Sequence, residues 1–350
     1  MRLLFDNLIY YLQDNGGIST YWYELTSRLL MEDEISLKFY EGGKKTSNLL
    51  RNQLRIAEDQ IIERPYLGGL LQKLVPLPRV VEPHIFHSSY FRIPKRTTDT
   101  VIVTTVHDFT YEKYYTGFRA CAHHYLKKRS INASDYIIAV SQHTKNDLLN
   151  FYPQLNEKSV KVIYHGAATD YKILGKAKME QEVPFFIFVG SREHYKNFDF
   201  AVQLTTRCKD FHLYVVGSSL SVREEAMVAQ WLGNRYRCFK EISNIQLNQL
   251  YNRAFCLLYP SSHEGFGIPI LEAMQAGCPF IALKASAVPE VAGQAGVLLE
   301  TLDLDEAYAG VQYINYQREV IIQKGLLQAA KFSWDRCFDE TYSLYKSIAS

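Results

Sequence analysis

The chain has 350 residues, of which 22% are charged, and its formal net charge is +2. This length exceeds what one hydrophobic core usually serves, so we expect two domains of ordinary size. The balanced charge does not favour an electrostatic nucleic-acid binder, and no run of about 18 apolar residues predicts a membrane-spanning helix.

The cysteines are scattered without a Cys-x-x-Cys pair, at positions 121, 208, 238, 256, 278 and 337. This pattern is typical of reduced thiols in a cytoplasmic protein. Residues 1–6 predict a first strand, because their apolar run is too short for a secretory signal. We therefore expect a cytoplasmic location, and peripheral contact with the inner face of the cell membrane stays open.

A glycine pair, Gly16 and Gly17, follows this first strand. A helical run over residues 21–30 comes next, with Ser19 or Thr20 expected as its cap. Such a turn can present backbone N–H groups to a diphosphate, although a glycine pair also occurs in ordinary turns. No Gly-x-Gly-x-x-Gly follows a strand, so a nicotinamide site has little support.

The β-rich run 101–106 ends at His107 and Asp108, which places His107 at the carboxyl end of a strand, where parallel sheets bind ligands. A histidine there can hydrogen-bond a sugar hydroxyl or balance developing charge. The alternative is a histidine held in its own loop by Asp108.

A helical run over residues 118–131 contains five basic side chains between residues 123 and 129, and a strand follows at 136–140. The helix is either an ordinary solvated one or a basic face that meets anionic lipid headgroups. The five are His123, His124, Lys127, Lys128 and Arg129.

A domain boundary is expected near residues 166–183, which are polar and irregular until Pro184 opens the apolar strand 185–189. Strands and helices alternate on both sides of this boundary, which predicts an α/β architecture with largely parallel sheets. The expected parts are a first domain at 1–166, a linker at 167–183, a second domain at 184–331 and a terminal helix at 332–350.

Gly190 and two cations, Arg192 and Lys196, follow strand 185–189. Arginine offers a planar fork and lysine a point charge, and both suit a diphosphate. The alternative is a pair of solvated surface cations. Further along, Gly217 ends the strand 213–216 and permits close approach of a ligand, and the backbone of Ile242 is expected to read a base edge.

The strand 255–259 leads into a loop that contains Glu264 and then a helix over residues 268–276. Glycines let the backbone approach a ligand, and the free N–H groups at the helix start favour an anion. Glu272 is expected in the first helical turn, facing the same crevice as Glu264. The residues expected to bind the ligand here are Glu264, Gly265, Phe266, Gly267, Ile268 and Glu272.

The alternative for the two glutamates is a solvated loop residue and a side chain that complements the helix dipole. The surrounding stretch, however, resembles the Glu-x7-Glu signature of the family 4 glycosyltransferases, and the similarity continues through residues 285–296. It covers nearly the whole chain and is weakest between residues 40 and 80. It implies the GT-B fold, in which two doubly wound Rossmann-like domains face a central cleft and the last helix returns to the first domain.

The resemblance also implies roles for these residues. The first domain would bind the acceptor, and the second would bind the nucleotide sugar. Glu272 would hold the ribose hydroxyls, and Glu264 and His107 would lie near the transferred sugar. Lys196 matches the family pattern, whereas Arg192 departs from it by one position, because Ser191 follows the glycine.

A retaining, metal-independent transfer is implied, without a cofactor, and the enzymes that the chain resembles are bacterial mannosyltransferases of polysaccharide synthesis. We expect GDP-mannose rather than a UDP-sugar as donor, and a growing surface polysaccharide or a lipid-linked oligosaccharide as acceptor. The Asp-Leu-Asp run at residues 303–305 is expected to be exposed at a helix start, not to bind metal.

Three other classes compete with this interpretation. A sugar-nucleotide epimerase or hydrolase of the same fold would bind the donor without transferring sugar to an acceptor. A non-catalytic sugar-nucleotide-binding protein would tolerate loss of the charged residues. A phosphorylase with pyridoxal phosphate would need a longer chain and a dedicated lysine site.

Overall fold

A computed structural model describes residues 1–14, 16–43, 46–74, 77–175 and 183–349. The chain forms two compact units, one of residues 1–165 and 334–350 and one of residues 166–333. The division falls beside the boundaries predicted at residues 166 and 332. Part of the predicted linker, residues 176–182, lies outside the described residues.

The described part of the first unit contains a seven-stranded parallel sheet in the order β3-β2-β1-β4-β5-β6-β7. Its strands are β1 (Arg2–Asp6), β2 (Ser36–Gly42), β3 (Ile61–Arg64), β4 (His84–Ser88), β5 (Thr100–Val106), β6 (Tyr136–Ala139) and β7 (Val160–Val162). Its helices are α1 (Ile9–Leu12), α2 (Gly17–Leu29), α3 (Leu49–Gln53), α4 (Gly69–Leu74), α5 (Thr110–Tyr114), α6 (Phe118–Ala133), α7 (Gln142–Phe151) and α14 (Trp334–Ala349).

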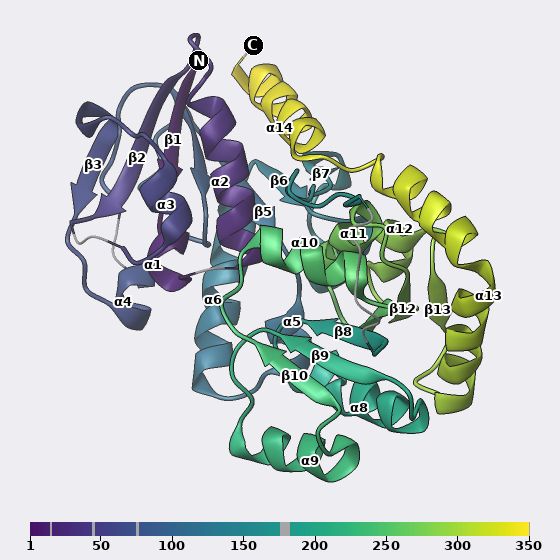
Figure 1. The fold of residues 1–350 in the computed structure, drawn as a ribbon. Coiled ribbons are helices and arrows are strands. Elements are labelled where there is room, and N and C mark those ends of the chain that lie inside the picture. The colour runs from purple at the N-terminus through teal and green to yellow at the C-terminus, as the bar shows by residue number, and fades with distance from the viewer. Residues whose placement is uncertain (15, 44–45, 75–76, 176–182, 350) are drawn as a thin grey trace. The chain divides into compact units, whose positions relative to one another are not determined.

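The terminal helix α14 packs on α2 and β4 of this first unit (Figure 1). Its Trp334 and Tyr345 enter the same buried cluster as Phe5 of β1 and Trp22 of α2. The apolar stripe of α14 therefore explains why the end of the chain belongs with the beginning.

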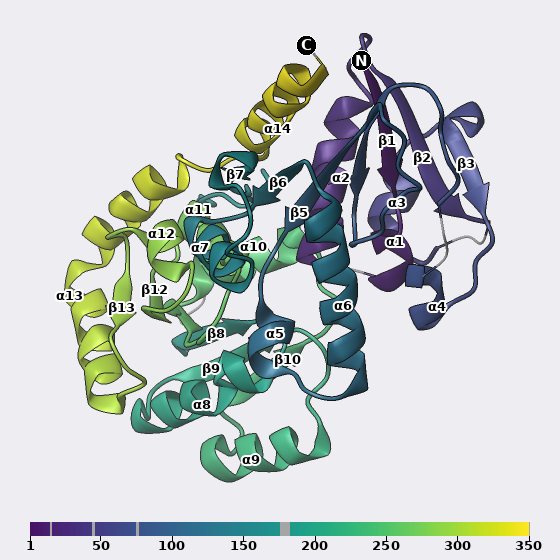
Figure 2. The same ribbon diagram turned by 180° about the vertical axis from the view of Figure 1, so that it is seen from behind.

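The second unit contains a six-stranded parallel sheet in its described residues, in the order β10-β9-β8-β11-β12-β13 (Figure 2). Its strands are β8 (Phe185–Val189), β9 (His212–Val216), β10 (Tyr236–Phe239), β11 (Cys256–Tyr259), β12 (Phe280–Leu283) and β13 (Val297–Leu299). Its helices are α8 (Phe198–Arg207), α9 (Val222–Leu232), α10 (Asn244–Arg253), α11 (Ile268–Gln275), α12 (Val288–Ala292) and α13 (Leu304–Ala329).

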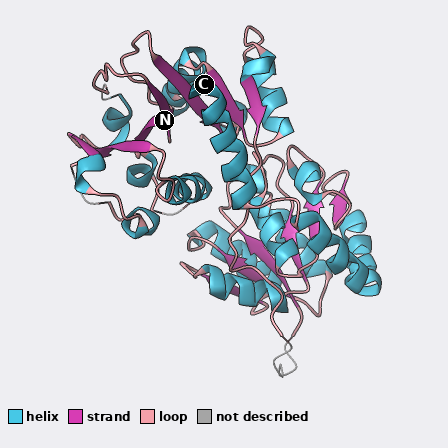
Figure 3. Ribbon diagram, turned by 90° about the horizontal axis from the view of Figure 1, so that it is seen from above, coloured by secondary structure: helices cyan, strands magenta, loops and turns pink. Residues whose placement is uncertain are grey.

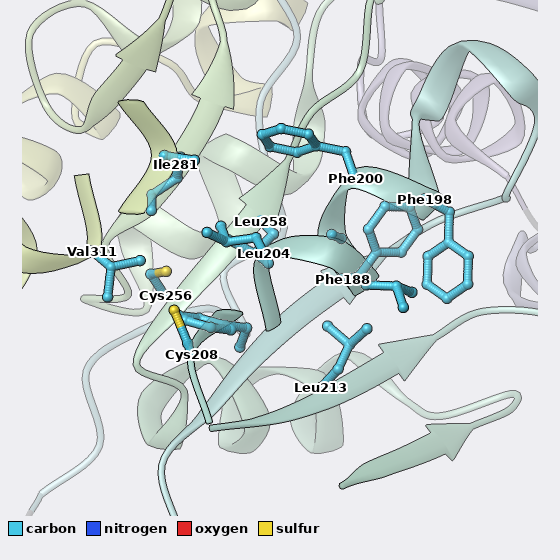
Figure 4. Close-up of a cluster of buried hydrophobic side chains, with 14 of the residues drawn as sticks. Phe188, Phe198, Phe200, Leu204, Cys208, Leu213, Cys256, Leu258, Ile281 and Val311 are labelled. Atoms are coloured by element: carbon cyan, nitrogen blue, oxygen red, sulfur yellow. The ribbon is translucent and has the colours of Figure 1, made fainter. Parts of the chain in front are cut away.

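Helices lie beside the strands of both sheets, as Figure 3 shows. In the second unit the core lies between the sheet and helices α8, α9 and α13. Phe188, Leu204, Leu213, Leu258 and Ile281 meet there (Figure 4). Both sheets reverse their strand order beside the first strand of the unit, and ligands of doubly wound sheets bind at such reversals.

The five strands predicted most explicitly are all present, with ends that differ by at most one residue from those predicted. Their short, β-branched and aromatic apolar runs leave little room for a helix. The prediction of a parallel α/β architecture is confirmed.

Candidate active site

Two glycines at the carboxyl ends of β8 and β9 bring their loops into contact. Gly217 has a φ of 151°, and a Cβ there would lie 2.6 Å from the carbonyl oxygen of Gly190. Gly190 has a φ of 126°, with no atom within 4 Å of a Cβ built there. Both loops therefore need glycine, and open space remains beside Gly190.

Arg192 is anchored by its own unit. Its Nε donates to Glu224 at 2.9 Å, and Nη2 donates to the carbonyl oxygen of Ser219 at 2.6 Å. The side chain is only 5% exposed, and Nη1 has no hydrogen-bond partner in the described part of the chain. Arg192 thus positions the loop, and its unpartnered Nη1 amino group is buried, whereas the sequence suggested a whole guanidinium for the diphosphate.

Lys196 and Glu264 form an ion pair at the strand ends. Lys196 Nζ lies 2.5 Å from Glu264 Oε1, and the two side chains are 15% and 12% exposed. The Lys196 ammonium also lies 5.6 Å from the ring of Tyr259, the last residue of β11. Two residues 68 positions apart are therefore brought together, as the prediction of a shared site requires.

Asn197 joins the loop that contains Lys196 to the loop that contains Glu264. The sequence analysis did not predict this residue. It has a φ of 51°, and its Nδ2 donates to the carbonyl oxygen of Pro260 at 2.8 Å and to Ser262 Oγ at 2.7 Å. The available signal was an asparagine just before a helix, since asparagine tolerates this backbone conformation. Ser286 was missed too, and its hydroxyl accepts the Glu264 backbone N–H at 2.8 Å.

Helix α11 begins after Gly267, whose φ is 106°, and Pro269 fills a position that needs no N–H donor. Glu272 is the fifth residue of this helix. The expectation of a place in the first turn was wrong, because 3.6 residues complete that turn before the glutamate is reached.

Burial raises the pKa of Glu272 to about 7, and hydrogen bonds with Tyr251 and Tyr171 oppose that rise. Tyr251 donates its O–H to Glu272 Oε2 at 3.1 Å. The carboxyl group therefore changes charge near neutral pH, and it is already surrounded by hydroxyl groups, the type of partner that a ribose offers.

The other predicted contacts of the second unit differ in accessibility. Phe266 is only 4% exposed and packs edge-on against Phe332 at 5.7 Å, so its side chain belongs to the core. Ile242 is partly exposed in the loop before α10. Gly265 lies in the loop before Gly267, and Ile268 is the first residue of α11.

In the first unit, the predicted cap of α2 was wrong. The helix begins at Gly17 with Gly16 as its N-cap, and the Gln13 side chain accepts the Ser19 backbone N–H at 3.4 Å. Ser19 and Thr20 instead donate their hydroxyls to the carbonyl oxygen of Gly16, at 2.8 and 3.1 Å. The helix therefore starts earlier than residue 21, and the remaining N–H groups of its first turn suit an anion.

His107 follows β5 directly, as predicted. Its ring stacks on His165 with centroids 5.6 Å apart and planes 4° apart, and the edge of Tyr21 packs against it at 5.2 Å. Burial lowers the pKa of His107 to about 4. Its imidazole is therefore neutral at physiological pH, with both hydrogen-bonding roles available.

Helix α6 does not present all five basic residues on one face. His123 and Lys127 are buried, and Lys127 Nζ donates to Glu112 at 2.7 Å and to the carbonyl oxygen of Asp108 at 2.8 Å. These two residues therefore do not belong to the basic face considered for the helix. The side of α6 that packs on the core must be buried, and Glu112 neutralises the lysine there. The exposed basic side chains are Arg119, His124, Lys128 and Arg129.

A cavity of about 530 Å³ lies at the ends of β2 and β3 in the first unit. There Arg51 donates two hydrogen bonds to the Glu41 carboxylate, from Nε at 2.6 Å and from Nη2 at 2.8 Å. Tyr11 and Glu63 add a ring and a further carboxylate to the lining. A cavity of this size, lined by both charged and apolar groups, suits a small molecule.

Two features bear on membranes and metals. Among the described residues, no helix combines the length and apolarity needed to span a bilayer. Asp303 caps helix α13, and it is exposed together with Asp305, as predicted.

Comparisons with known proteins identify the family of the chain. The models of the Glycosyltransferase Family 4 and of the Glycosyl transferases group 1 match residues 15–171 and 171–317 respectively. O-antigen chain mannosyltransferase B of Escherichia coli is 26% identical, over 95% of this chain and 96% of its own.

Solved structures share the fold. Sucrose-phosphate synthase from Thermosynechococcus elongatus superposes with a TM-score of 0.79 at 15% identity, covering 100% of both chains. HepE of Anabaena, solved with UDP and glucose, gives 0.72 at 16% identity, covering 99% of this chain and 100% of its own. The predicted GT-B fold class is confirmed, and the chain belongs to the family 4 glycosyltransferases.

Proposed function

We propose that this glycosyltransferase moves mannose, with retention of configuration, from GDP-mannose to a growing surface polysaccharide or a lipid-linked oligosaccharide. The Lys196–Glu264 pair carries the proposal, because it sets a cation and a carboxylate 2.5 Å apart at the carboxyl ends of parallel strands. The mannosyl part is supported by the name of the E. coli relative.

The second unit would bind the nucleotide. The diphosphate would lie over the open space beside Gly190, within reach of Lys196 and the N–H groups that begin α11. Glu272 would accept hydrogen bonds from the two ribose hydroxyls, and the backbone of Ile242 would contact the base.

In the reaction, the bond between the sugar C1 and the phosphate oxygen breaks, and negative charge grows on the departing diphosphate. Lys196 neutralises that charge, and Glu264 offers its carboxylate to the positive sugar ring. The leaving phosphate takes the proton of the acceptor hydroxyl, which attacks from the same face. These protein groups supply the charge, so the proposal includes no metal and no cofactor.

The first unit would bind the acceptor. The neutral His107 can hydrogen-bond a sugar hydroxyl. The cavity between Tyr11, Glu41, Arg51 and Glu63 combines carboxylates, a guanidinium and an aromatic ring, and we assign an acceptor sugar to it.

Incubation with radiolabelled GDP-mannose and a lipid-linked oligosaccharide extract tests this function. We expect label in the lipid-extractable product, an α-linked mannose by NMR, and loss of both in Glu264→Gln. Free mannose without product would indicate a hydrolase instead, and transfer from UDP-glucose alone would replace the donor assignment.

A further inference from the structure

The loop that contains His107 has three residues, 107–109, between the end of β5 and the start of α5. We call it the histidine loop. His107 is partly exposed, whereas Phe109 is buried in the core of the first unit. The Asp108 carboxylate accepts the Thr110 N–H at 3.1 Å, so this side chain is used at the start of α5. A ligand can therefore reach the imidazole from solvent, while the rest of the loop is anchored to the fold.

A lysine from helix α6 holds the backbone of the histidine loop. Lys127 Nζ donates to the carbonyl oxygen of Asp108 at 2.8 Å and to Glu112 Oε2 at 2.7 Å. The ammonium also lies 4.5 Å from the centre of the Phe109 ring. The Lys127 side chain is 1% exposed, and the Glu112 side chain is fully buried. The backbone one residue after His107 is thus bonded to a cation whose own position is fixed.

The packing of α6 alone does not require this buried pair of charges. An apolar pair of similar volume often stabilises a protein as well as an ion pair does, because two ions must leave water to form the pair. An apolar side chain, however, cannot donate a hydrogen bond to a carbonyl oxygen. The bond to the histidine loop is therefore what distinguishes Lys127 from a methionine or a leucine at the same place.

The ring of His107 is held by contacts on its other sides. It stacks on His165, with the two planes 4° apart, and the edge of Tyr21 packs against it at 5.2 Å. The Tyr21 hydroxyl lies 3.0 Å from Thr105 Oγ1 of β5, so Tyr21 is itself fixed. Together with the bond from Lys127 to the loop backbone, these contacts orient the imidazole in the ligand-free protein.

We infer that Lys127 is a positioning residue for the transfer reaction: its ammonium holds the carbonyl oxygen of Asp108, which fixes the histidine loop and presents His107 to a sugar hydroxyl. The inference rests on the proposed role of His107 towards the sugar. It adds a buried residue of α6, a helix for which the sequence suggested only a solvated or a lipid-facing role.

Steady-state transfer kinetics with radiolabelled GDP-mannose test the inference. The variant Lys127→Met/Glu112→Gln removes the ammonium together with its counter-charge, so no buried carboxylate is left unpaired. We expect this variant to fold and to keep the KM for the donor, which the second unit would bind. Its kcat should fall about 30-fold, because a small displacement of a group beside the reacting atoms is costly.

The matched control is Glu112→Gln. Its amide oxygen still accepts a hydrogen bond from Lys127, and the bond from Lys127 to Asp108 stays in place. We expect this control to be less stable than the wild type in thermal unfolding, since the buried ammonium loses its counter-charge. Its kcat should nevertheless stay close to the wild-type value, so that activity and stability change in opposite order in the two variants.

NMR of the ligand-free protein reports the position of His107 without any substrate. In protein labelled at the histidine ring carbons, His107 is assigned through His107→Gln, and ring currents from Tyr21 and His165 displace its signal. We expect that displacement to shrink in Lys127→Met/Glu112→Gln and to persist in Glu112→Gln. Lys127→Leu/Glu112→Leu is a second, fully apolar pair with the same expected change, should the first pair not fold.

The two measurements separate this inference from the proposed function. A His107 signal that keeps its wild-type position in the folded double variant overturns the inference. An equal change in Glu112→Gln also overturns it, because the effect would then belong to the ion pair. A changed signal with an unchanged kcat, or a wild type that transfers no mannose, contradicts the proposed function and still shows that Lys127 holds the histidine loop if the signal moves.

Discussion

In the second unit, the two charged side chains at the centre of the candidate site form an ion pair with each other. Lys196 and Glu264 neutralise each other at 2.5 Å, and both remain partly exposed. A diphosphate would compete with Glu264 for the lysine, and the released carboxylate would then face the sugar. The pair therefore supplies both charges that the proposed reaction uses, the ammonium for the diphosphate and the carboxylate for the sugar.

Glu264→Gln and Lys196→Ala should each lower kcat/KM by about 100-fold or more, since each removes charge that matters most in the transition state. Steady-state kinetics with radiolabelled donor measure this. The matched control is Lys284→Ala, which breaks an exposed Lys–Glu pair of the same 2.5 Å length in the same unit. Variants as active as the control would contradict the assignment.

Glu272 predicts a pH dependence of its own. Its pKa in the folded chain, about 7, lies above the ordinary value of 4.5 for a glutamate, so the folded state holds a proton that the unfolded state has released. Stability of the nucleotide-free protein should fall as pH rises from about 5 to 7, whereas nucleotide affinity should rise through about pH 7. Thermal unfolding and calorimetry check both trends. Glu272→Gln should flatten both, and an unchanged slope would be evidence against the buried carboxyl group.

At the scale of elements, the site depends on where strands end and helices begin. The sequence predicted these places well, because the apolar strand 185–189, Pro269 at the start of α11, and Gly277 and Pro279 after its end are local signals. It could not predict which distant groups fasten the loops. Asn197 and Ser286 hold loop backbones through contacts across the chain, and Arg192 is bound by Glu224, a partner 32 residues away.

The glycine contact between the ends of β8 and β9 gives a prediction for elements. Gly217→Ala should destabilise the protein by about 2–4 kcal/mol, because the Cβ meets the Gly190 backbone and the positive φ is unfavourable. Gly233→Ala, with a φ of 61° and no atom within 4 Å of a Cβ, should cost only about 1 kcal/mol. Urea unfolding measures both. Equal losses of unfolding free energy in the two variants would mean that the contact between the two loops does not contribute to stability.

At the scale of the whole molecule, the two Rossmann-like units and the return of α14 to the first unit follow the predicted fold class. Alternation of apolar strands and amphipathic helices made that class visible. The outward face of α6 was harder to predict, because burial of Lys127 depends on Glu112 from the neighbouring helix. Only tertiary contacts show which basic residues remain exposed.

The exposed part of α6 still predicts membrane contact. Phe118 and Tyr125 are 80% and 62% exposed beside the exposed Lys128 and Arg129. We expect binding to anionic liposomes in a flotation assay, and loss of it in Lys128→Glu/Arg129→Glu. Lys209→Glu/Lys324→Glu alters the same charge at exposed positions of the second unit and should float like the wild type. Wild-type protein that stays unbound would refute the contact.

The most direct test of the central claim is calorimetric and thermal-shift titration with GDP, UDP, dTDP and their sugars, comparing the wild type with Glu272→Ala and Lys196→Ala. We expect GDP and GDP-mannose to bind and stabilise the wild type, and both variants to lose that stabilisation. Binding of none of these nucleotides, or equal binding by the variants, would contradict the assignment of the donor site.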